Sequence, residues 1–325
     1  MKLTIAILII GIAAVVGLGQ APTLQIVTSD PNLPSELFYG SVKVKPLRVR
    51  PGTNPPQFIT INDNDFYVQQ QYIDFLSRMP DQSGFQFWLN NITTCGADVG
   101  CREVRRIDTS AGFFKSIEYS TTGVLAERTY KAAFGDGTGA STFNGNHNLS
   151  VPVIRFSDFQ TDVKQLNKNL VVLQTGWQAV LEANTVAYFD AFVQRSTFTS
   201  KYSSLTNAQF VDTLNDNAKD ANNVKPLSPA ERDQLVGALD GGTTTRAKAL
   251  RIVAEDADLV NSESNRAFVL TEYFGYLRRD PNSGQDTDYT GYDFWLTKLN
   301  QFNGNYIQAE MVKAFNSSAE YLNRF

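Results

Sequence analysis

An internal repetition constrains the fold of this chain more than any other feature of its sequence. A stretch that begins at Tyr72 recurs at Tyr273, and each copy continues with an Arg-x-Pro step, a Gly-aromatic-x-Phe-Trp-Leu step and a closing Ser-x-Glu-Tyr. Matches in the same order indicate that one structural unit occurs at least twice. The residues predicted to form its aromatic core are Tyr72, Trp88, Phe113 and Tyr119 in the first copy, and Tyr273, Trp295, Phe315 and Tyr321 in the second.

The repeated unit has the pattern of three short helices. Apolar residues recur at helical spacing over residues 66–76, after polar residues that can cap a helix. Pro80 or Pro281 would end the first helix, Gly84 or Gly291 would open the second, and the third would end at the Ser-x-Glu-Tyr step. Helices this short bury little apolar surface alone, so an all-α fold is predicted, with repeated three-helix units packed into one helical domain.

Four units are predicted within this domain, which covers residues 62–325. The middle two match weakly because they lack the Arg-x-Pro step. One of them contains a Gly- and Asn-rich insert, Gly135 to Ser150, which is expected to be a flexible loop, and no partner motif accompanies His147 there. The predicted unit bounds are 62–123, 124–203, 207–258 and 262–325.

The first 21 residues have the order of a secretory signal. Lys2 precedes an apolar run from Ile5 to Leu18, which is shorter than the roughly 20 residues of a membrane-spanning helix. A cleaved signal peptide is the preferred interpretation. An uncleaved anchor, suggested by Pro22 after the expected cut, and an internal helix are the alternatives. With a signal, the chain would contact the membrane only transiently, through the signal segment. It would then be secreted or held at the cell surface, and a periplasmic location is the alternative.

Residues 22–61 have a different pattern from the rest of the chain. Apolar and polar residues alternate with period two over residues 23–28, 41–45 and 47–50, and prolines separate these stretches. This pattern predicts a short β-containing arm or linker rather than a full domain.

The two cysteines, Cys95 and Cys101, lie six positions apart in a loop that contains two glycines. In an oxidising compartment a disulfide between them is the preferred interpretation. A redox-active pair is the alternative, and it lacks the two-residue spacing that lowers a thiol pKa.

Composition disfavours several classes of function. Lys and Arg number 29 against 33 Asp and Glu, for a net charge of −4, so a nucleic-acid partner is not expected. One His and two Cys disfavour a zinc site and the nucleophiles that need an imidazole. Acidic residues are spread over every segment, so no carboxylate pair stands out and no catalytic residue is predicted.

The repeated charged and tryptophan residues each allow two main interpretations. Arg78 and Glu118 in the first copy, like Arg279 and Glu320 in the second, are possible structural ion pairs that clamp the proline turn to the last helix. Independent surface positions are the other interpretation, with a functional dyad third. The tryptophans are interpreted as core, and the alternative is that they and the preceding phenylalanines form platforms that stack on sugars.

One loop of the second copy is a candidate calcium site. Asp280, Asn282, Asp286 and Asp288 alternate around a glycine, and Ca²⁺ prefers several oxygen ligands on a flexible loop. However, Gly291 occupies the twelfth position, where an EF-hand has a bidentate Glu. A solvated acidic loop is therefore preferred, and no cofactor other than calcium is considered.

The Arg-x-Pro, Gly-x-x-x-Trp and Ser-x-Glu-Tyr steps resemble the bacterial domain-of-unknown-function family 4214 from about residue 62 to residue 325. Within that family, the stretches that begin at Phe268 and Phe294 are similar to a subgroup common in soil bacteria such as acidobacteria. A looser similarity to the helical linker domains of phycobilisomes falls at the same positions. The resemblance implies an all-α fold and extracellular placement, and it carries no agreed activity or catalytic residue.

These features together favour a non-catalytic extracellular or cell-surface interaction or structural module. Its expected partner is an extracellular polymer or protein, or a second copy of the chain contacted through the amino-terminal arm. A calcium-dependent adhesion module and a hydrolase of extracellular polysaccharide are the alternatives.

Overall fold

The computed structural model describes residues 24–27, 36–39, 42–45, 48–50, 52, 53, 55 and 57–325. The chain divides into two compact units, one through Thr60 together with Phe325, and one from Ile61 to Arg324. The predicted signal, residues 1–21, lies outside the described residues. Among the helices that are described, none combines the length and the apolar character needed to cross a bilayer.

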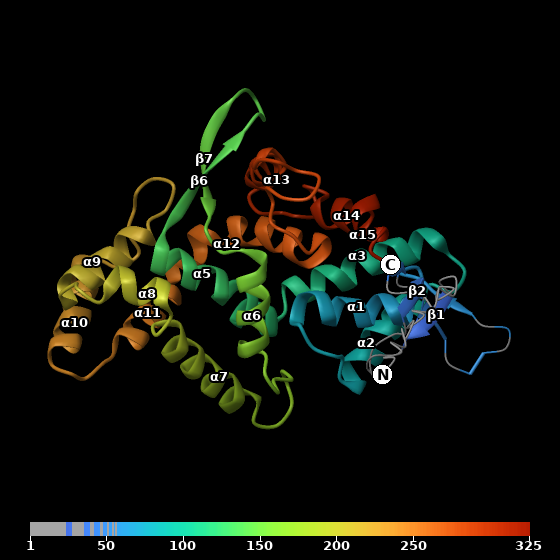
Figure 1. Cartoon of the computed structure of the whole chain (residues 1–325), viewed down its shortest axis with the longest axis horizontal. Coiled ribbons are helices and arrows are strands. Elements are labelled where there is room, and N and C mark those ends of the chain that lie inside the picture. The colour runs from blue at the N-terminus through green and yellow to red at the C-terminus, as the bar shows by residue number, and fades with distance from the viewer. Residues whose placement is uncertain are drawn as a thin grey trace, which may run out of the picture. The chain divides into compact units, whose positions relative to one another are not determined.

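The first unit contains short antiparallel strands (Figure 1). Three of them form a sheet in the order β1-β2-β3, and Tyr39 pairs directly with Val42. Alternation in the sequence predicts β1, β3 and β4 but not β2, whose sequence Glu-Leu-Phe-Tyr does not alternate. The strand bounds are β1 Leu24–Val27, β2 Glu36–Tyr39, β3 Val42–Lys45, β4 Arg48–Val49 and β5 Phe58–Ile59, with β4 paired to β5.

The second unit is mostly helical, and this confirms the predicted fold class. Its first part contains α1 Asn64–Leu76, α2 Gln82–Thr93, α3 Val99–Phe114, α4 Ile117–Thr121, α5 Gly123–Phe134, strands β6 Asp136–Ser141 and β7 His147–Pro152, and α6 Phe156–Leu166. Its second part contains α7 Trp177–Phe192, α8 Ser196–Tyr202, α9 Asn207–Asn217, α10 Pro229–Asp240, α11 Arg246–Ala254, α12 Ala257–Glu272, the π-helix η1 Tyr273–Leu277, α13 Thr290–Gln301, α14 Met311–Asn316 and α15 Ala319–Leu322.

Helix α5 lies at the centre of this unit, in contact with α4, α6, α9, α11 and α12 (Figure 1). Ala126, Ala132 and Ala133 are fully buried, and their small side chains let the surrounding helices approach closely. A helix covered on every side must also bury its polar residues, which then need partners. Arg128 accordingly donates from Nε to the carbonyl oxygen of Ala254 at 2.8 Å.

Two details of the predicted helices are corrected by the structure. Helix α2 begins at Gln82 with Asp81 as its cap, so Gly84 lies in the first turn rather than opening the helix. The closing Ser-x-Glu-Tyr step starts a short helix instead of ending one. Ser116 caps α4 and Ser318 caps α15, each by accepting a hydrogen bond from the backbone N–H three residues later. The serine of this step is an N-cap residue, which marks the start of a helix. The prediction was wrong because it placed this step at the end of the preceding helix.

The Gly- and Asn-rich insert is a β-hairpin and not a flexible loop. Strands β6 and β7 pair in a regular antiparallel register from Asp136 with Pro152 to Ser141 with His147. Glycine at 137 and 139 is a weak strand former, so local propensity concealed this element. Gly139 is required by packing, because a Cβ there would lie 2.5 Å from the Tyr289 ring.

Candidate functional site

The structure brings together both predicted ion pairs. Arg78 donates from Nε and Nη2 to the two carboxylate oxygens of Glu118, at 2.6 and 2.7 Å. Arg279 binds Glu320 in the same two-pronged way, at 2.5 and 3.0 Å. Each pair joins the turn after the first helix of its copy to the short helix at the end. A paired guanidinium and carboxylate of this kind fix geometry, and neither group is free for chemistry.

The aromatic residues of the two copies also make matching contacts. Tyr72 packs edge-on against Phe113 at 4.7 Å, and Tyr273 packs against Phe315 at 5.2 Å. Tyr119 and Tyr321, at the ends of the copies, are buried as well.

The two tryptophans depart from the predicted core position, because both are only half-buried. Trp88 lies on Phe113 at 5.7 Å and Trp295 on Phe315 at 5.5 Å, so one face of each indole covers the core. The preceding phenylalanine stands at 5.0 Å and 76° to the indole in both copies. The Phe-Trp step therefore forms the outer edge of each aromatic cluster.

The outer face of α13 is covered by the tip of the β6–β7 hairpin. The Phe143 ring meets Phe294 edge to face at 5.4 Å and 89°. The backbone N–H of Thr142 donates to Thr290 Oγ1 at 2.9 Å, and Tyr289 N–H donates to the Ala140 carbonyl at 2.9 Å. Phe294 is 38% exposed beneath this cover.

A longer loop also covers the ion pair of the second copy. Ten positions separate Pro281 from Gly291, whereas four separate Pro80 from Gly84. The extra residues place Asp286 against Arg279, with Nη2 to Oδ2 at 2.7 Å. The acidic loop therefore adds a third partner to the Arg279–Glu320 pair.

The other candidate calcium ligands are also engaged by protein groups. Asp280 accepts from the backbone N–H of Phe156 at 2.8 Å, Asn282 accepts from Arg155 at 3.0 Å, and Asp288 accepts from the N–H of Thr290 at 2.9 Å. Within the described part of the chain, no group of three or more His, Cys, Asp or Glu side chains is arranged to hold a metal ion. The structure thus does not assemble the four side chains into a cation site.

The matching face of α2 is open, and it forms one wall of a groove of about 570 Å³. Phe87, the counterpart of Phe294, is 64% exposed. The lining also includes Trp88, Tyr72 and Phe113, together with the loop of residues 171–174. The groove therefore has an aromatic lining, and we call it the α2 groove.

Apolar side chains also form the rim of the α2 groove. Leu173 is 84% exposed and has φ of 74°, a left-handed conformation that is uncommon for a bulky residue. Ile117 on the adjacent side is 51% exposed. An exposed leucine in this conformation and an exposed phenylalanine line the same groove, which favours a contact surface.

The pKa values of Tyr72 and Asp81, in the α2 groove, are shifted in opposite directions. Burial and then the charge of Asp81 raise the pKa of Tyr72 to about 12. Burial alone would raise the pKa of Asp81, but hydrogen bonds from Gly84 and Ser83 and the charge of Arg78 lower it. A general acid or base works best with a pKa near the working pH, so these groups favour binding over proton transfer.

A second, polar groove of about 1020 Å³ lies beside the hairpin. Its base contains a buried charge cluster in which Lys131 binds Asp136 at 2.8 Å, and Arg266 binds Asp136 at 2.6 Å and Glu263 at 3.1 Å. Burial and then the charge of Glu263 raise the pKa of Glu127 to about 8. Glu127 and Glu263 are each only 2% exposed, so this pair of carboxyl groups faces the interior and not the groove.

His147, which no partner motif accompanies in the sequence, contacts the Asp293 carboxylate in the structure. Its Nε2 lies 3.1 Å from Asp293 Oδ2, which also accepts a hydrogen bond from Ser141 at 2.7 Å. His147 and Ser141 belong to the hairpin, and Asp293 belongs to α13. The three residues are not ordered as a catalytic triad, because the aspartate, not the imidazole, is at the centre. They fasten the hairpin to α13.

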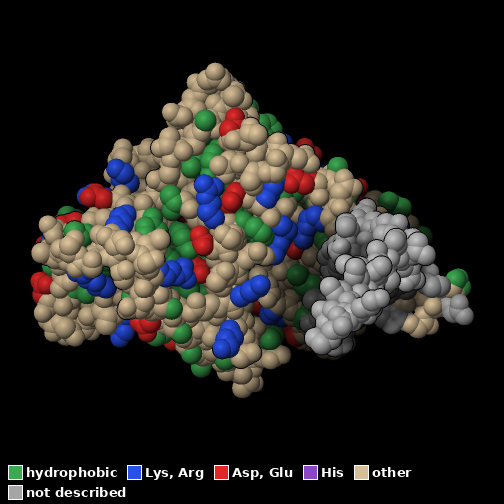
Figure 2. Space-filling model, viewed as in Figure 1, with side chains coloured by type: hydrophobic (Ala, Val, Ile, Leu, Met, Phe, Trp, Pro, Cys, Tyr) green, Lys and Arg blue, Asp and Glu red, His purple; other side chains and the backbone are tan. Residues whose placement is uncertain are grey.

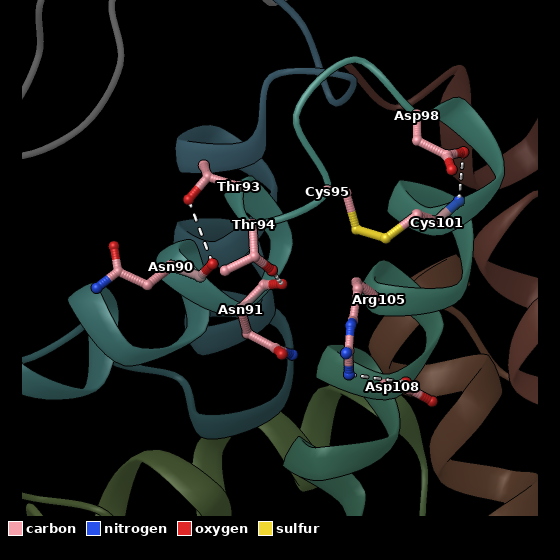
Figure 3. Close-up of a disulfide and its surroundings, with 9 residues drawn as sticks. All are labelled: Asn90, Asn91, Thr93, Thr94, Cys95, Asp98, Cys101, Arg105 and Asp108. Atoms are coloured by element: carbon pink, nitrogen blue, oxygen red, sulfur yellow. Dashed lines mark hydrogen bonds and ion pairs between the residues drawn. A yellow bond between two sulfur atoms is a disulfide. The ribbon is translucent and has the colours of Figure 1, made fainter.

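The predicted disulfide joins Cys95 and Cys101, with their Cα atoms 5.6 Å apart (Figure 3). Asp98, between them, caps α3 by accepting from the N–H of Cys101 at 3.0 Å. Gly96 has φ of 55°, which lets the chain turn between α2 and α3. The disulfide thus holds the end of α2 beside the start of α3.

Charges on the visible face of the helical unit are mixed. Figure 2 shows basic and acidic side chains interspersed across it, with apolar side chains between them. Many of the basic groups have a carboxylate partner, such as Arg251 with Glu182 at 2.7 Å and Arg232 with Asp212 at 2.7 Å.

Comparison of the chain with protein-family models, with curated proteins and with solved structures found no match. The resemblance to family 4214 and to phycobilisome linkers therefore stays a prediction. Several residues of the α2 groove, including Tyr72, Trp88 and Phe113, were predicted from the sequence as core, whereas Ser83 and the loop of residues 171–174 were not predicted. The unequal loops after Pro80 and Pro281 were a usable signal for it, whereas nothing in the sequence marks Leu173.

Proposed function

We propose that this chain is a non-catalytic interaction module that works outside the cytoplasm and binds its partner in the α2 groove. One observation supports this most: the hairpin packs on the Phe-Trp edge of the second copy, whereas the matching edge of the first copy is more exposed among the described residues. Phe87 is 64% exposed, whereas Phe294 is 38% exposed. Aromatic rings at the edge of a groove supply large contact area at a low cost in conformational entropy.

Three features favour export of the chain. The first 21 residues have the order of a cleavable signal. The disulfide between Cys95 and Cys101 suits an oxidising compartment. The resemblance to family 4214 implies the same placement. The proposed location is secreted or cell-surface, and the proposed partner is an extracellular polymer or protein.

Binding through the α2 groove is tested with the full secreted chain. Retention on insoluble cellulose, chitin and peptidoglycan is measured by co-sedimentation, and self-association by sedimentation velocity. The wild-type chain is expected to make at least one of these contacts, and Phe87→Ala is expected to weaken it about tenfold, the loss of one aromatic contact of about 1.4 kcal/mol.

Phe302→Ala is the matched control, because Phe302 is 36% exposed and lies outside the α2 groove. Equal behaviour of the wild-type chain and Phe87→Ala in every assay would contradict the proposal. Release of soluble sugar from the polymers would show hydrolysis and contradict the non-catalytic assignment. Amino-terminal sequencing of exported protein tests the signal, and a sequence that begins at Met1 would exclude cleavage.

A further inference from the structure

The covered face of α13 shows what the open face of α2 is built to hold. The two helices carry the same Gly-aromatic-x-Phe-Trp-Leu sequence, and aligning Gly84 with Gly291 pairs Phe87 with Phe294 and Ser83 with Thr290. The hairpin uses both α13 positions: Phe143 packs on Phe294, and Thr142 N–H donates to the Thr290 hydroxyl.

In the first copy, no hairpin among the described residues packs on the same two contact groups. The Phe87–Trp88 geometry, 5.0 Å and 76°, equals that of Phe294–Trp295. Ser83 lines the α2 groove, and its hydroxyl, which donates to Asp81 at 2.7 Å, keeps lone pairs for an incoming N–H. The ring and the hydroxyl thus repeat the acceptor arrangement on α13.

We infer that the α2 groove binds a β-hairpin of another protein that carries an aromatic residue at its tip. This inference rests on the proposed function and names the partner class. The aromatic ring of the hairpin would meet Phe87 edge to face, and a backbone N–H beside it would donate to Ser83 Oγ. The two contacts involve one aromatic ring and one backbone N–H, so they constrain few other residues of the hairpin. The ligand is therefore defined by its hairpin conformation and by an aromatic residue at the tip.

The probe is a cyclic peptide of residues 138–150, fluorescently labelled, because its strands pair from Thr138 with Ser150 to Ser141 with His147 and place Phe143 at the tip. Its anisotropy is titrated with the full secreted chain. Binding is expected, with about tenfold weakening for Phe87→Ala in the chain or Phe143→Ala in the peptide. Ser83→Ala is expected to weaken binding about threefold, as for the loss of one neutral hydrogen bond.

The matched control is Phe294→Ala, which is expected to leave peptide affinity unchanged. Sensitivity to Phe294→Ala but not to Phe87→Ala would show exchange with the chain's own hairpin and overturn the inference. No binding up to about 1 mM peptide, a free energy of about −4 kcal/mol, would also overturn it. Self-association lost in Phe87→Ala and in Phe143→Ala would identify a second copy as the occupant, again against the inference.

The experiments distinguish failure of the proposed function from failure of the proposed hairpin partner. If Phe87→Ala abolishes retention on a polymer while the peptide does not bind, the α2 groove remains the contact surface and the hairpin partner is wrong. If the peptide binds in the expected pattern and no polymer is retained, the partner is a protein, as inferred.

Discussion

At the scale of single residues, the two ion pairs are alike in geometry but different in surroundings. The Glu118 side chain is 5% exposed, and beyond Arg78 its carboxylate has little access to water. The Glu320 side chain is 25% exposed, and Asp286 lies 2.7 Å from Arg279, whereas the additional carboxylate of the first pair, Asp81, lies 3.5 Å from Arg78. Burial alone would lower the pKa of Arg78, but its hydrogen bond to Glu118 and the charge of that residue raise it. The first pair therefore depends on both members.

Glu118→Gln is expected to destabilise the protein by about 3 kcal/mol, the low end for removing one charge of a buried pair. Glu320→Gln is the matched control, with an expected cost of about 1 kcal/mol because water and Asp286 still compensate Arg279. Urea unfolding followed by circular dichroism measures both. Equal losses would show that the environment of the two pairs does not matter.

Buried carboxyl groups give the protein a pH dependence of defined sign. Burial raises the pKa of Glu127 to about 8 and of Glu272 well above its usual value. A carboxyl group with a raised pKa stays protonated in the folded chain at a pH where the unfolded chain has already released the proton. The stability contribution is complete below about pH 4.5, the unfolded value, and is lost as pH rises through the folded value.

The free energy of unfolding is thus expected to fall as pH rises from about 5 to about 8, by up to about 1.4 kcal/mol per pH unit for each such group. Glu127→Gln should flatten this slope in urea unfolding across that range. Glu182→Gln is the control, because Arg251 lowers the pKa of Glu182 and its effect belongs below pH 4.5. A slope that Glu127→Gln leaves unchanged would refute the assignment.

At the scale of elements, the π-helix η1 of the second copy packs against helix α1 of the first copy. Helix α1 is regular, whereas the matching segment of the second copy, η1, has π geometry over Tyr273–Leu277. The ring of Phe75 lies against Gly275, where any Cβ would overlap it, and meets Tyr276 edge to face at 5.1 Å. A glycine within η1 therefore lets α1 and η1 pack closely.

Gly275→Ala is expected to cost about 1–3 kcal/mol, since overpacking the Phe75 ring outweighs the better helix propensity of alanine. Gly237→Ala in α10 is the matched control, because a Cβ there meets nothing within 4 Å. That control should stabilise the protein by about 0.5–1 kcal/mol. Thermal unfolding of both variants decides the matter, and a neutral Gly275→Ala would mean that α1 and η1 are not tightly packed.

At the scale of the whole helical unit, one charge cluster joins its beginning to its end. Asp74 in α1 has a side chain only 1% exposed, and Arg324 binds both of its oxygens, at 2.7 and 3.0 Å. Arg324 also donates to the carbonyl oxygens of Gly275 and Tyr276. Residues 250 positions apart thus share one buried network, and the first and last copies are held together.

Arg324→Ala is expected to lower the free energy of unfolding by about 3 kcal/mol, because it leaves the buried Asp74 carboxylate with a neutral hydrogen bond from Gln70 at 2.9 Å and with Arg278 at 3.9 Å as its nearest charge. Lys313→Ala removes an exposed pair with Glu103 and should cost less than about 1 kcal/mol. Urea denaturation midpoints compare them. A cost for Arg324→Ala as small as that of Lys313→Ala would show that the network does not hold the unit together.

The sequence by itself predicted the helical class and, from the spacing of Cys95 and Cys101, the disulfide. The ion pairs within the two copies were one of two interpretations, and the structure decided between them. Even there, local signals misplaced the start of α2 and the serine-capped helices, because a capping residue and the end of a helix look alike in sequence.

Only the tertiary structure decided which copy of the Phe-Trp edge is exposed. The two edges have the same residues, and their difference comes from what packs on them: the β6–β7 hairpin packs on Phe294, whereas no hairpin among the described residues packs on Phe87. Burial of a surface residue depends on contacts far along the chain, which no local pattern encodes, and the candidate site exists because those contacts are made once rather than twice.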